Sequence, residues 1–372
     1  YYSGASPLHP IGTLLHSPLG TGLAAFIGIV SETEQCPSGP QAARSRFDQP
    51  GDTKLRSDQP EIATHKDGES KAFANSQMIA HCNPVSPNGI SRNGGQTLNR
   101  GDLPPSPAND GELRILQLTD LHLYADPSRR LLGQNTQRTL HLVMELAREV
   151  FWPVHRVLLT GDLVHDESAE GYRLLEGILS RFGAPCSCIP GNHDSSRVMT
   201  RALGDHLVGM GSSVRSGAWN LVLLDSTVPG EDRGHLDRQQ LEHLEVSLSA
   251  HADAHALVCL HHQPVSVGSA WVDTMALDNP QDLFALTDRH PQVRGILWGH
   301  VHQEFSSRRR GVELYAAPST CVQFLPGSED FAVDTRTPGF RWLELYPDGR
   351  IRTGIERIAA YPDSIDLTAG GY

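Results

Sequence analysis

The sequence predicts an α/β domain with a largely parallel sheet that begins near Gly111. From there onward, short apolar runs of strand length alternate with stretches of helical periodicity, and this alternation is typical of α/β proteins. Most of the core runs also lead directly into a polar motif. Ligands of open α/β sheets bind beyond the carboxyl ends of the strands, so these motifs are expected to form one site.

Several apolar runs have the length of strands. They are Leu113–Leu118, Arg156–Thr160, Cys186–Pro190, Leu221–Leu224, Ala256–Leu260, Gly295–Trp298, Val312–Ala317 and Phe340–Tyr346. The last two runs have no helical stretch between them, and Asp348-Gly349 after them is a hairpin-type turn. We therefore expect the C-terminal part of the domain to be antiparallel.

Three stretches between these runs place apolar residues on one face of a helix. The three stripes are Leu140, Val143, Ala147 and Val150, then Leu174, Leu175, Ile178, Leu179 and Phe182, and finally Leu241, Leu244 and Leu248. Spacing of three and four residues predicts amphipathic helices with one face toward the sheet.

The segment before the domain has a different composition. Pro, Gly, Ser, Asn and Gln are frequent in residues 1–110, and such a stretch cannot bury enough apolar surface to offset its ordering entropy. We predict a disordered low-complexity extension, or upstream sequence read in frame before a later start, since the first methionine is Met78. Residues 11–30 are broken by Gly and Pro and predict neither a signal peptide nor a membrane span. The folded domain is expected at 111–358 and a C-terminal tail at 359–372.

Charge and cysteine content limit the partners and the compartment. Lys and Arg total 31 against 43 Asp and Glu, a formal net charge of −12, which is unfavourable for general binding of DNA or RNA. The six cysteines form no zinc-type CxxC pair, so we expect reduced thiols in a cytoplasmic protein. We expect no nucleic-acid partner and no membrane partner, and a homodimer is compatible with the sequence.

Five predicted strands end in motifs that can bind metal. These are Asp120-Leu121-His122, Gly161-Asp162, Gly191-Asn192-His193-Asp194, His261-His262 and Gly299-His300-Val301-His302. Asp120 and His122 are two residues apart, so on an extended backbone their side chains point the same way and can bind one ion. His300 and His302 repeat this arrangement. A glycine precedes the first ligand in three of the motifs, where it allows a tight turn and a close approach to metal.

The ligand chemistry and the number of ligands predict two metal ions. The candidate ligands are Asp120, His122, Asp162, Asn192, His261, His300 and His302. Carboxylate, imidazole and amide oxygen together favour Mn, Fe or Zn over Ca or Mg. Seven side chains are too many for one tetrahedral site but fit two ions that share a bridging carboxylate. Each motif alone is more often a turn, a cap or a strand end, whereas all five at strand ends predict a dinuclear centre.

Four residues near these motifs have two interpretations each. Asp194 either orients a ligand or caps the following helix. His262 either contacts a ligand or the substrate, or has a structural role. Trp271 and Phe324 either stack on a purine or pack in the core, and packing is the commoner role of such residues.

The ordered motifs resemble those of the calcineurin-like metallophosphoesterase superfamily over residues 111–358. The resemblance implies a four-layer α/β/β/α sandwich with a dinuclear metal centre. The residues that it implies for the first ion are Asp120, His122 and His302. Those that it implies for the second ion are Asn192, His261 and His300. By the same resemblance, Asp162 would bridge the ions, and His193 would face the phosphate without binding metal.

Segments between the motifs resemble the bacterial class III 3′,5′-cyclic AMP phosphodiesterases. These segments include Leu132-Gly133-Gln134-Asn135-Thr136, Leu224-Asp225-Ser226, Gly234-His235-Leu236 and His261-His262-Gln263-Pro264. Phosphoprotein phosphatases of the superfamily have an Asp-Arg-Gly after the bridging aspartate, and its arginine clamps a phosphomonoester. Here Asp162 is followed by Leu163-Val164-His165-Asp166-Glu167, with no such arginine, so a dianionic monoester lacks its bidentate partner, which a monoanionic diester needs less.

These observations predict hydrolysis of 3′,5′-cyclic AMP to 5′-AMP by a hydroxide that bridges two ions of Fe, Mn or Zn. His193 would protonate the leaving 3′ oxygen or stabilise its charge, and Asn192 next to it is the other candidate catalytic residue. The residues expected to contact the substrate are His122, Asp162, Asn192, His193 and His302. The alternatives are hydrolysis of 2′,3′-cyclic nucleotides, glycerophosphodiesters or phospholipid headgroups, or a noncatalytic binding protein. The noncatalytic alternative is disfavoured because no ligand position is missing.

Overall fold

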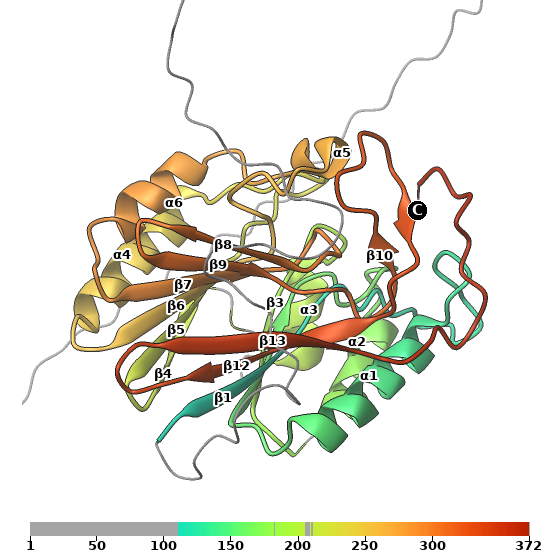
Figure 1. Cartoon of the computed structure of the whole chain (residues 1–372), viewed down its shortest axis with the longest axis horizontal. Coiled ribbons are helices and arrows are strands. Elements are labelled where there is room, and N and C mark those ends of the chain that lie inside the picture. Colours follow the sequence, from blue (N-terminus) through green and yellow to red (C-terminus); the bar gives the residue numbers. More distant parts are fainter. Residues whose placement is uncertain (1–110, 182, 205–208, 210, 372) are drawn as a thin grey trace, which may run out of the picture. The chain divides into compact units, whose positions relative to one another are not determined.

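Two mixed β-sheets lie face to face in the computed structural model, which describes residues 111–181, 183–204, 209 and 211–371 (Figure 1). Helices cover the outer face of each sheet. This is the four-layer α/β/β/α arrangement that the resemblance implies. The predictions for residues 1–110 and for Phe182 fall outside the described residues.

The first sheet combines the N-terminal parallel strands with the C-terminal hairpin. Its strands are β1 (Leu113–Leu118), β2 (Arg156–Thr160), β3 (Cys186–Ile189), β12 (Gly339–Leu345) and β13 (Ile351–Arg357). The strand order is β13-β12-β1-β2-β3. β1, β2 and β3 pair in parallel, whereas β12 is antiparallel to both β1 and β13. The antiparallel pairing predicted around the Asp348-Gly349 turn is therefore confirmed.

The second sheet is parallel in its centre and antiparallel at both edges. Its strands are β4 (Ser212–Ser216), β5 (Trp219–Leu223), β6 (His255–Cys259), β7 (Val293–Trp298), β8 (Phe305–Arg309) and β9 (Val312–Ala316). The order is β4-β5-β6-β7-β9-β8. The expected antiparallel pairing holds on one side of β9, which is antiparallel to β8, but not on the other, where β9 is parallel to β7. The reason is that the hairpin after β7 places β8 at the sheet edge and returns β9 beside β7. A separate pair is formed by β10 (Gln323–Phe324) and β11 (Val333–Asp334).

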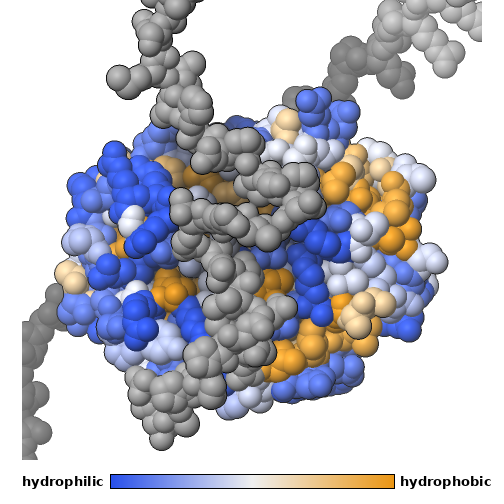
Figure 2. All heavy atoms as spheres, viewed as in Figure 1, coloured by the Kyte–Doolittle hydropathy of each residue, from blue (hydrophilic) through white to orange (hydrophobic). Residues whose placement is uncertain are grey.

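The helices begin at polar capping residues and form the two outer layers. They are α1 (Thr136–Val150), α2 (Ala169–Leu179), α3 (Ser196–Leu203), α4 (Arg238–Ala250), α5 (Ala270–Asp273) and α6 (Pro280–Thr287). The side chains of Asn135, Ser168 and Asp237 accept a backbone N–H at the starts of α1, α2 and α4. Hydrophilic residues predominate on the surface around α4 and α6 (Figure 2). No helix of the described residues is both long and apolar enough to cross a membrane.

Three hydrophobic clusters join the four layers. Leu116 and Leu118 of β1 pack toward α1, α2 and α3, whereas Leu113 and Ile115 pack between the two sheets. This division follows from the alternation of side chains along a strand. A third cluster, which includes Leu244 of α4, lies between the second sheet and its helices. The sheets are thus covered on both faces, which fixes the strand ends that carry the polar motifs.

The residues after β13 pack against the loop before α1. Residues 359–371 contain no helix or strand. The backbone N–H of Asp366 donates to Leu132 O at 3.0 Å, and Gln134 Nε2 donates to Asp363 O at 2.8 Å. Ile365 packs beside the small cluster around Tyr124. The tail therefore contacts a segment that follows the first candidate ligands.

The cysteines of the described residues lie within the cores. Cys186, Cys188, Cys259 and Cys321 are all free and buried. Cys186 and Cys188 share one face of β3 and belong to the same cluster. The thiols therefore behave as small apolar core residues, and burial raises the pKa of Cys186 to about 11.

Replacing Leu158 in the cluster between the sheets is expected to destabilise the protein. Leu158 is 1% exposed, and a buried Leu→Ala change leaves a cavity that costs about 2–5 kcal/mol. Denaturant unfolding should show this loss for Leu158→Ala. The matched control is Leu325→Ala, because Leu325 is 44% exposed and its loss should change stability by about 0.5 kcal/mol or less. Equal effects of the two variants would contradict the proposed packing.

Candidate metal centre

All five predicted motifs lie at the carboxyl ends of strands, and backbone hydrogen bonds join them across both sheets. Asp120 N donates to Gly161 O at 3.0 Å, which links the segments after β1 and β2. Gly299 N donates to His261 O at 3.1 Å, which links those after β7 and β6. His300 N donates to Asp120 Oδ1 at 3.0 Å and so connects the two sheets. The strand ends thus form one continuous site.

Asp120, His122, Asp162 and His302 form the first group of candidate ligands. One ligand atom from each lies within 4.8 Å of those of the others. The Nε2 atoms of His122 and His302 are 3.2 Å apart. His122 Nε2 lies 3.6 Å from Asp162 Oδ2, and His302 Nε2 lies 3.6 Å from Asp120 Oδ1. All four side chains are buried.

A second group lies on the other side of Asp162. Asn192 Oδ1 is 3.2 Å from His261 Nε2 and 3.0 Å from His300 Nδ1. Asp162 Oδ2 lies 3.4 Å from His261 Nε2. The same carboxylate oxygen therefore faces His122 of the first group and His261 of the second. All seven predicted ligands are brought together, and one carboxylate is shared between the two groups.

The polar atoms of this site fit divalent cations. Asp120 Oδ2 is buried and has no hydrogen-bond partner among the described residues. Burial of a charged or polar atom is costly unless a hydrogen bond or an opposite charge compensates it. Nitrogen and oxygen donors that converge in this way suit transition-metal ions. Bound cations would therefore compensate the cost of burying these polar atoms.

The pKa shifts of the candidate ligands also favour metal binding. Burial, opposed by His261 and reinforced by Asp162, raises the pKa of Asp120 to about 8. Burial lowers the pKa of His302 to about 3 and holds that of His122 well below its usual range. Burial also opposes ionisation of Asp162, but His261 and other facing histidines hold its pKa well below the usual value. The imidazoles of His122 and His302 are thus neutral and keep lone pairs for metal.

The glycines before the candidate ligands allow the loops to pack closely on one another. A Cβ on Gly161 would lie 2.2 Å from His261 Nδ1, and one on Gly191 would lie 2.2 Å from Asp162 Oδ1. On Gly299 it would lie 2.1 Å from the Thr119 hydroxyl. These distances are far below van der Waals contact, so the three positions need glycine.

The extended backbone predicted for Asp120–His122 and for His300–His302 is wrong. All four of these histidine and aspartate ligands have positive φ, between 46° and 67°, and so does Asp162 at 53°. The physical reason is that β1 ends at Leu118 and the next residues hydrogen-bond to the turn after β2. Left-handed backbone is strained for such residues and is concentrated at functional sites.

Asp194 orients the loops and does not cap the following helix. Its carboxylate accepts the backbone N–H groups of Leu163, Val164 and Gly191 at 2.9–3.1 Å, and the Tyr172 hydroxyl at 2.8 Å. The N-cap residue of α3 is Ser195, which makes no side-chain capping bond. Asp194 therefore joins the loop that contains Asp162 to the loop that contains Asn192.

His193 lies next to the shared carboxylate. Its backbone N–H donates to Asp162 Oδ1 at 2.9 Å, which leaves Oδ2 directed at the two groups of histidines. The His193 ring is half-buried and meets the His122 ring edge-on, with centroids 5.0 Å apart. The side chain is thus placed at the border of the first ligand group.

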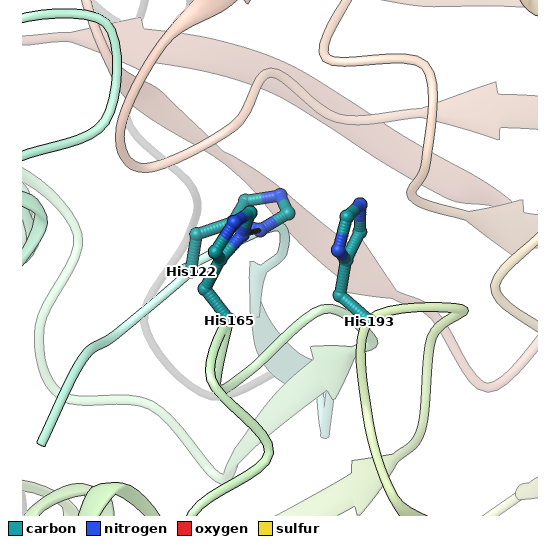
Figure 3. Close-up of side chains that lie close together, drawn as sticks. All are labelled: His122, His165 and His193. Atoms are coloured by element: carbon teal, nitrogen blue, oxygen red, sulfur yellow. Dashed lines mark hydrogen bonds between the residues drawn. The ribbon is translucent and has the colours of Figure 1, made fainter. Parts of the chain in front are cut away.

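His165, which no sequence motif indicated, lies in the same cluster. His165 Nδ1 lies 3.0 Å from His122 Nδ1, and its ring stacks on that of His193 at 4.8 Å and 19° (Figure 3). Burial, with His193, lowers the pKa of His165 to about 4. In the sequence it is one polar residue of a turn, and no local signal distinguishes it from a surface histidine.

Phe324 and Trp271 pack beside the site. The Phe324 ring is 1% exposed and stacks on His302 at 4.1 Å and 10°, so it supports a candidate ligand and is closed to a purine. Trp271 meets Phe324 edge-on at 4.9 Å.

His262 is buried against the second ligand group. Its Nδ1 pairs with the Ser226 hydroxyl at 2.8 Å. Its ring contacts those of His261 and His300, with centroids 4.9 Å and 4.8 Å away. His262 thus contacts ligands, which was one of its two interpretations.

Residues 113–304 match the calcineurin-like phosphoesterase family. The chain is 41% identical over 268 residues to the 3′,5′-cyclic adenosine monophosphate phosphodiesterase CpdA of Pseudomonas aeruginosa, covering 72% of this chain and 98% of that protein. It is 40% identical over 267 residues to CpdA of Escherichia coli K12, covering 71% and 97%. It is also 40% identical over 246 residues to the 3′,5′-cyclic-nucleotide phosphodiesterase alr5338 of Nostoc, covering 66% and 92%.

A methyl group at Gly191 is expected to displace the shared carboxylate. The Cβ of Gly191→Ala would lie 2.2 Å from Asp162 Oδ1 and 2.4 Å from its backbone nitrogen. We expect Mn²⁺ affinity to fall by about 10–100-fold, as when groups that orient metal ligands are lost. Calorimetric titration of metal-free protein measures this. Gly177→Ala is the matched control, since its Cβ would meet nothing within 4 Å. Wild-type affinity in Gly191→Ala would contradict the geometry.

Proposed function

Because the chain belongs to the calcineurin-like phosphoesterase family, we propose that it is a metal-dependent phosphodiesterase that hydrolyses 3′,5′-cyclic AMP to 5′-AMP. Its relatives at 40–41% identity have that activity in their names and are covered almost completely. The observation that carries the proposal is the placement of Asp162 Oδ2, 3.6 Å from His122 Nε2 and 3.4 Å from His261 Nε2. One carboxylate oxygen between two ligand sets is what a dinuclear site requires.

We assign the ligands of the two ions from this division. Those of the first ion are Asp120, His122 and His302. Those of the second ion are Asn192, His261 and His300. Asp162 is the shared ligand. Bound Fe, Mn or Zn ions would supply positive charge at the phosphate and an activated water at neutral pH.

The charge of the ligand set suits a phosphodiester. Asp120 and Asp162 are the two acidic members of the set, and the other ligands, four imidazoles and an amide, are neutral when they bind metal. Two divalent ions therefore leave a net positive site that attracts a monoanion. A 3′,5′-cyclic nucleotide presents one such charge at its phosphate.

The turn after Asp162 disfavours a phosphomonoester. Leu163 and Val164 follow Asp162, and both are fully buried with their N–H groups bound to Asp194. The five residues after Asp162, Leu163-Val164-His165-Asp166-Glu167, include no arginine whose guanidinium could form a bidentate pair with a dianionic phosphate. The local structure thus supports diester over monoester hydrolysis.

His193 is placed to handle the proton of the leaving group. Its backbone N–H is bound to Asp162 Oδ1, while the half-buried ring projects beside His122. We propose that the ring donates a proton to the 3′ oxygen as the phosphorus–oxygen bond breaks, or stabilises the charge that forms there. The residues proposed to contact the substrate are His122, Asp162, Asn192, His193 and His302.

A substrate panel tests the proposed activity. The protein reconstituted with Mn²⁺ should hydrolyse 3′,5′-cyclic AMP faster than 2′,3′-cyclic AMP or bis(p-nitrophenyl) phosphate, with 5′-AMP as product. Chelation should abolish turnover and added Mn²⁺ should restore it, because the ligands alone do not activate water at neutral pH. Hydrolysis of the synthetic diester with neither nucleotide cleaved would show a different diesterase.

Two substitutions separate proton transfer from metal binding. His193→Ala should keep metal but lose about 10²–10⁴ in kcat, the usual contribution of a general acid. Asp162→Ala should weaken binding of both ions, because it removes the shared ligand. Metal content and kcat are measured on the same samples, with His251→Ala as control because His251 ends α4 in the outer layer. Loss of metal with unchanged activity per metal in His193→Ala would refute its proposed role.

A further inference from the structure

The ring of His165 contacts two residues of the candidate centre that have different proposed roles. Its Nδ1 lies 3.0 Å from Nδ1 of His122, a proposed ligand of the first ion. Its face stacks on His193, the proposed proton donor, at 4.8 Å and 19°. Figure 3 shows the three side chains side by side. The proposed mechanism assigns no role to His165.

The outer nitrogens of two other histidine ligands show what the contact with His122 does. His261 Nδ1 lies 2.7 Å from Thr160 O, and His302 Nδ1 lies 2.9 Å from Val322 O. A carbonyl only accepts, so each Nδ1 is the protonated nitrogen and each Nε2 keeps its lone pair for metal. His122 also presents Nε2 to the first group, and its Nδ1 meets His165 in place of a carbonyl.

The proton in the His122–His165 pair follows from this pattern. A hydrogen bond between two imidazole nitrogens needs one donor and one acceptor. Because His122 Nε2 faces Asp162 and His302, the proton of His122 belongs on Nδ1 and donates to His165 Nδ1. His165 then has its own proton on Nε2. The contact therefore fixes the tautomer in which His122 can bind metal.

The backbone around His165 is held on both sides. His165 N donates to Leu123 O at 2.8 Å, in the segment just after His122. Next to it, Asp166 Oδ2 accepts the N–H of Ala125 at 3.0 Å. The Tyr124 ring also contacts His165, with centroids 5.0 Å apart. These contacts place the imidazole before metal or substrate arrives.

We propose that His165 is a positioning residue with two separable contacts: its Nδ1 sets the tautomer of His122, and its ring face holds His193 in place. The proposal rests on the proposed function, because the tasks of His122 and His193 come from it. It predicts that metal affinity and turnover respond to different parts of one side chain.

Three variants separate the two contacts. His165→Asn keeps an acceptor near the position of Nδ1 and removes the ring. His165→Phe keeps a flat ring against His193 and removes the acceptor. His165→Ala removes both, and His251→Ala at the end of α4 is the control for the loss of a histidine outside the cluster. Thermal unfolding of each variant shows whether it is folded.

The metal readout uses Mn²⁺ titration of the metal-free proteins by calorimetry. In His165→Ala and His165→Phe, the affinity for at least one of the two Mn²⁺ ions should fall by about 10–100-fold. This is the usual effect of losing a group that orients a metal ligand. His165→Asn should stay within about threefold of wild type, because its amide oxygen accepts the His122 proton.

The catalytic readout is kcat for 3′,5′-cyclic AMP at saturating Mn²⁺. His165→Ala and His165→Asn should lose about two- to tenfold, since an aromatic pair contributes about that factor when converted to a rate. His165→Phe should stay within about twofold of wild type once its metal sites are filled. This crossed pattern supports the proposal, and a merely structural residue would not produce it.

Two results would overturn the inference. If His165→Asn and His165→Phe both have wild-type Mn²⁺ affinity and kcat, neither contact matters. If both variants match His165→Ala in affinity and kcat, the two contacts are not separable. Failure of the proposed function is a different outcome, in which the wild-type protein binds Mn²⁺ but does not cleave cyclic AMP. In that case the calorimetry still decides whether His165 supports His122.

Discussion

The structure of the site depends on the buried carboxylate of Asp162. It is 1% exposed, and its Oδ2 faces a histidine from each of the two ligand groups. Its Oδ1 accepts the backbone N–H of His193. A buried carboxylate without compensating charge or hydrogen bonds would destabilise the protein by about several kcal/mol. Histidines from both sheets supply that environment, so the two sheets must meet at their carboxyl ends for the site to exist.

The backbone around this carboxylate is strained, and the cores on both sides make the strain tolerable. Asp120, His122, Asp162, His300 and His302 all have positive φ, and such conformations cost about 1–3 kcal/mol each. The strands that precede them are covered on both faces by the three hydrophobic clusters. The packed strands therefore end at fixed points, and the short turns beyond them keep the left-handed conformations that direct these side chains inward.

Features that depend on local sequence were predicted well, and those that depend on distant partners were not. The bounds of β1 and β2 agree with the apolar runs, and the seven candidate ligands lie together because each follows a buried strand. The edge strands β4 and β8 were missed because they are polar and partly exposed and have no apolar pattern. His165 was missed because its role comes from His122, which is 43 residues away. The left-handed backbone was missed for the same reason, since hydrogen bonds from another turn determine it.

Hydrogen bonds join the loops that hold the two ligand groups. His122 N donates to Asp162 O and Leu123 N to Leu163 O, so the segment after β1 continues to pair with the segment after β2 beyond the end of the sheet. Asp194 then ties that second segment to Gly191 and hence to the loop after β3. A shift in any one turn therefore changes the position of Asp162 relative to both ligand groups. Since metal ligands must be placed within a fraction of an ångström to act, this network explains why so many residues that touch no metal are buried and hydrogen-bonded around seven that can.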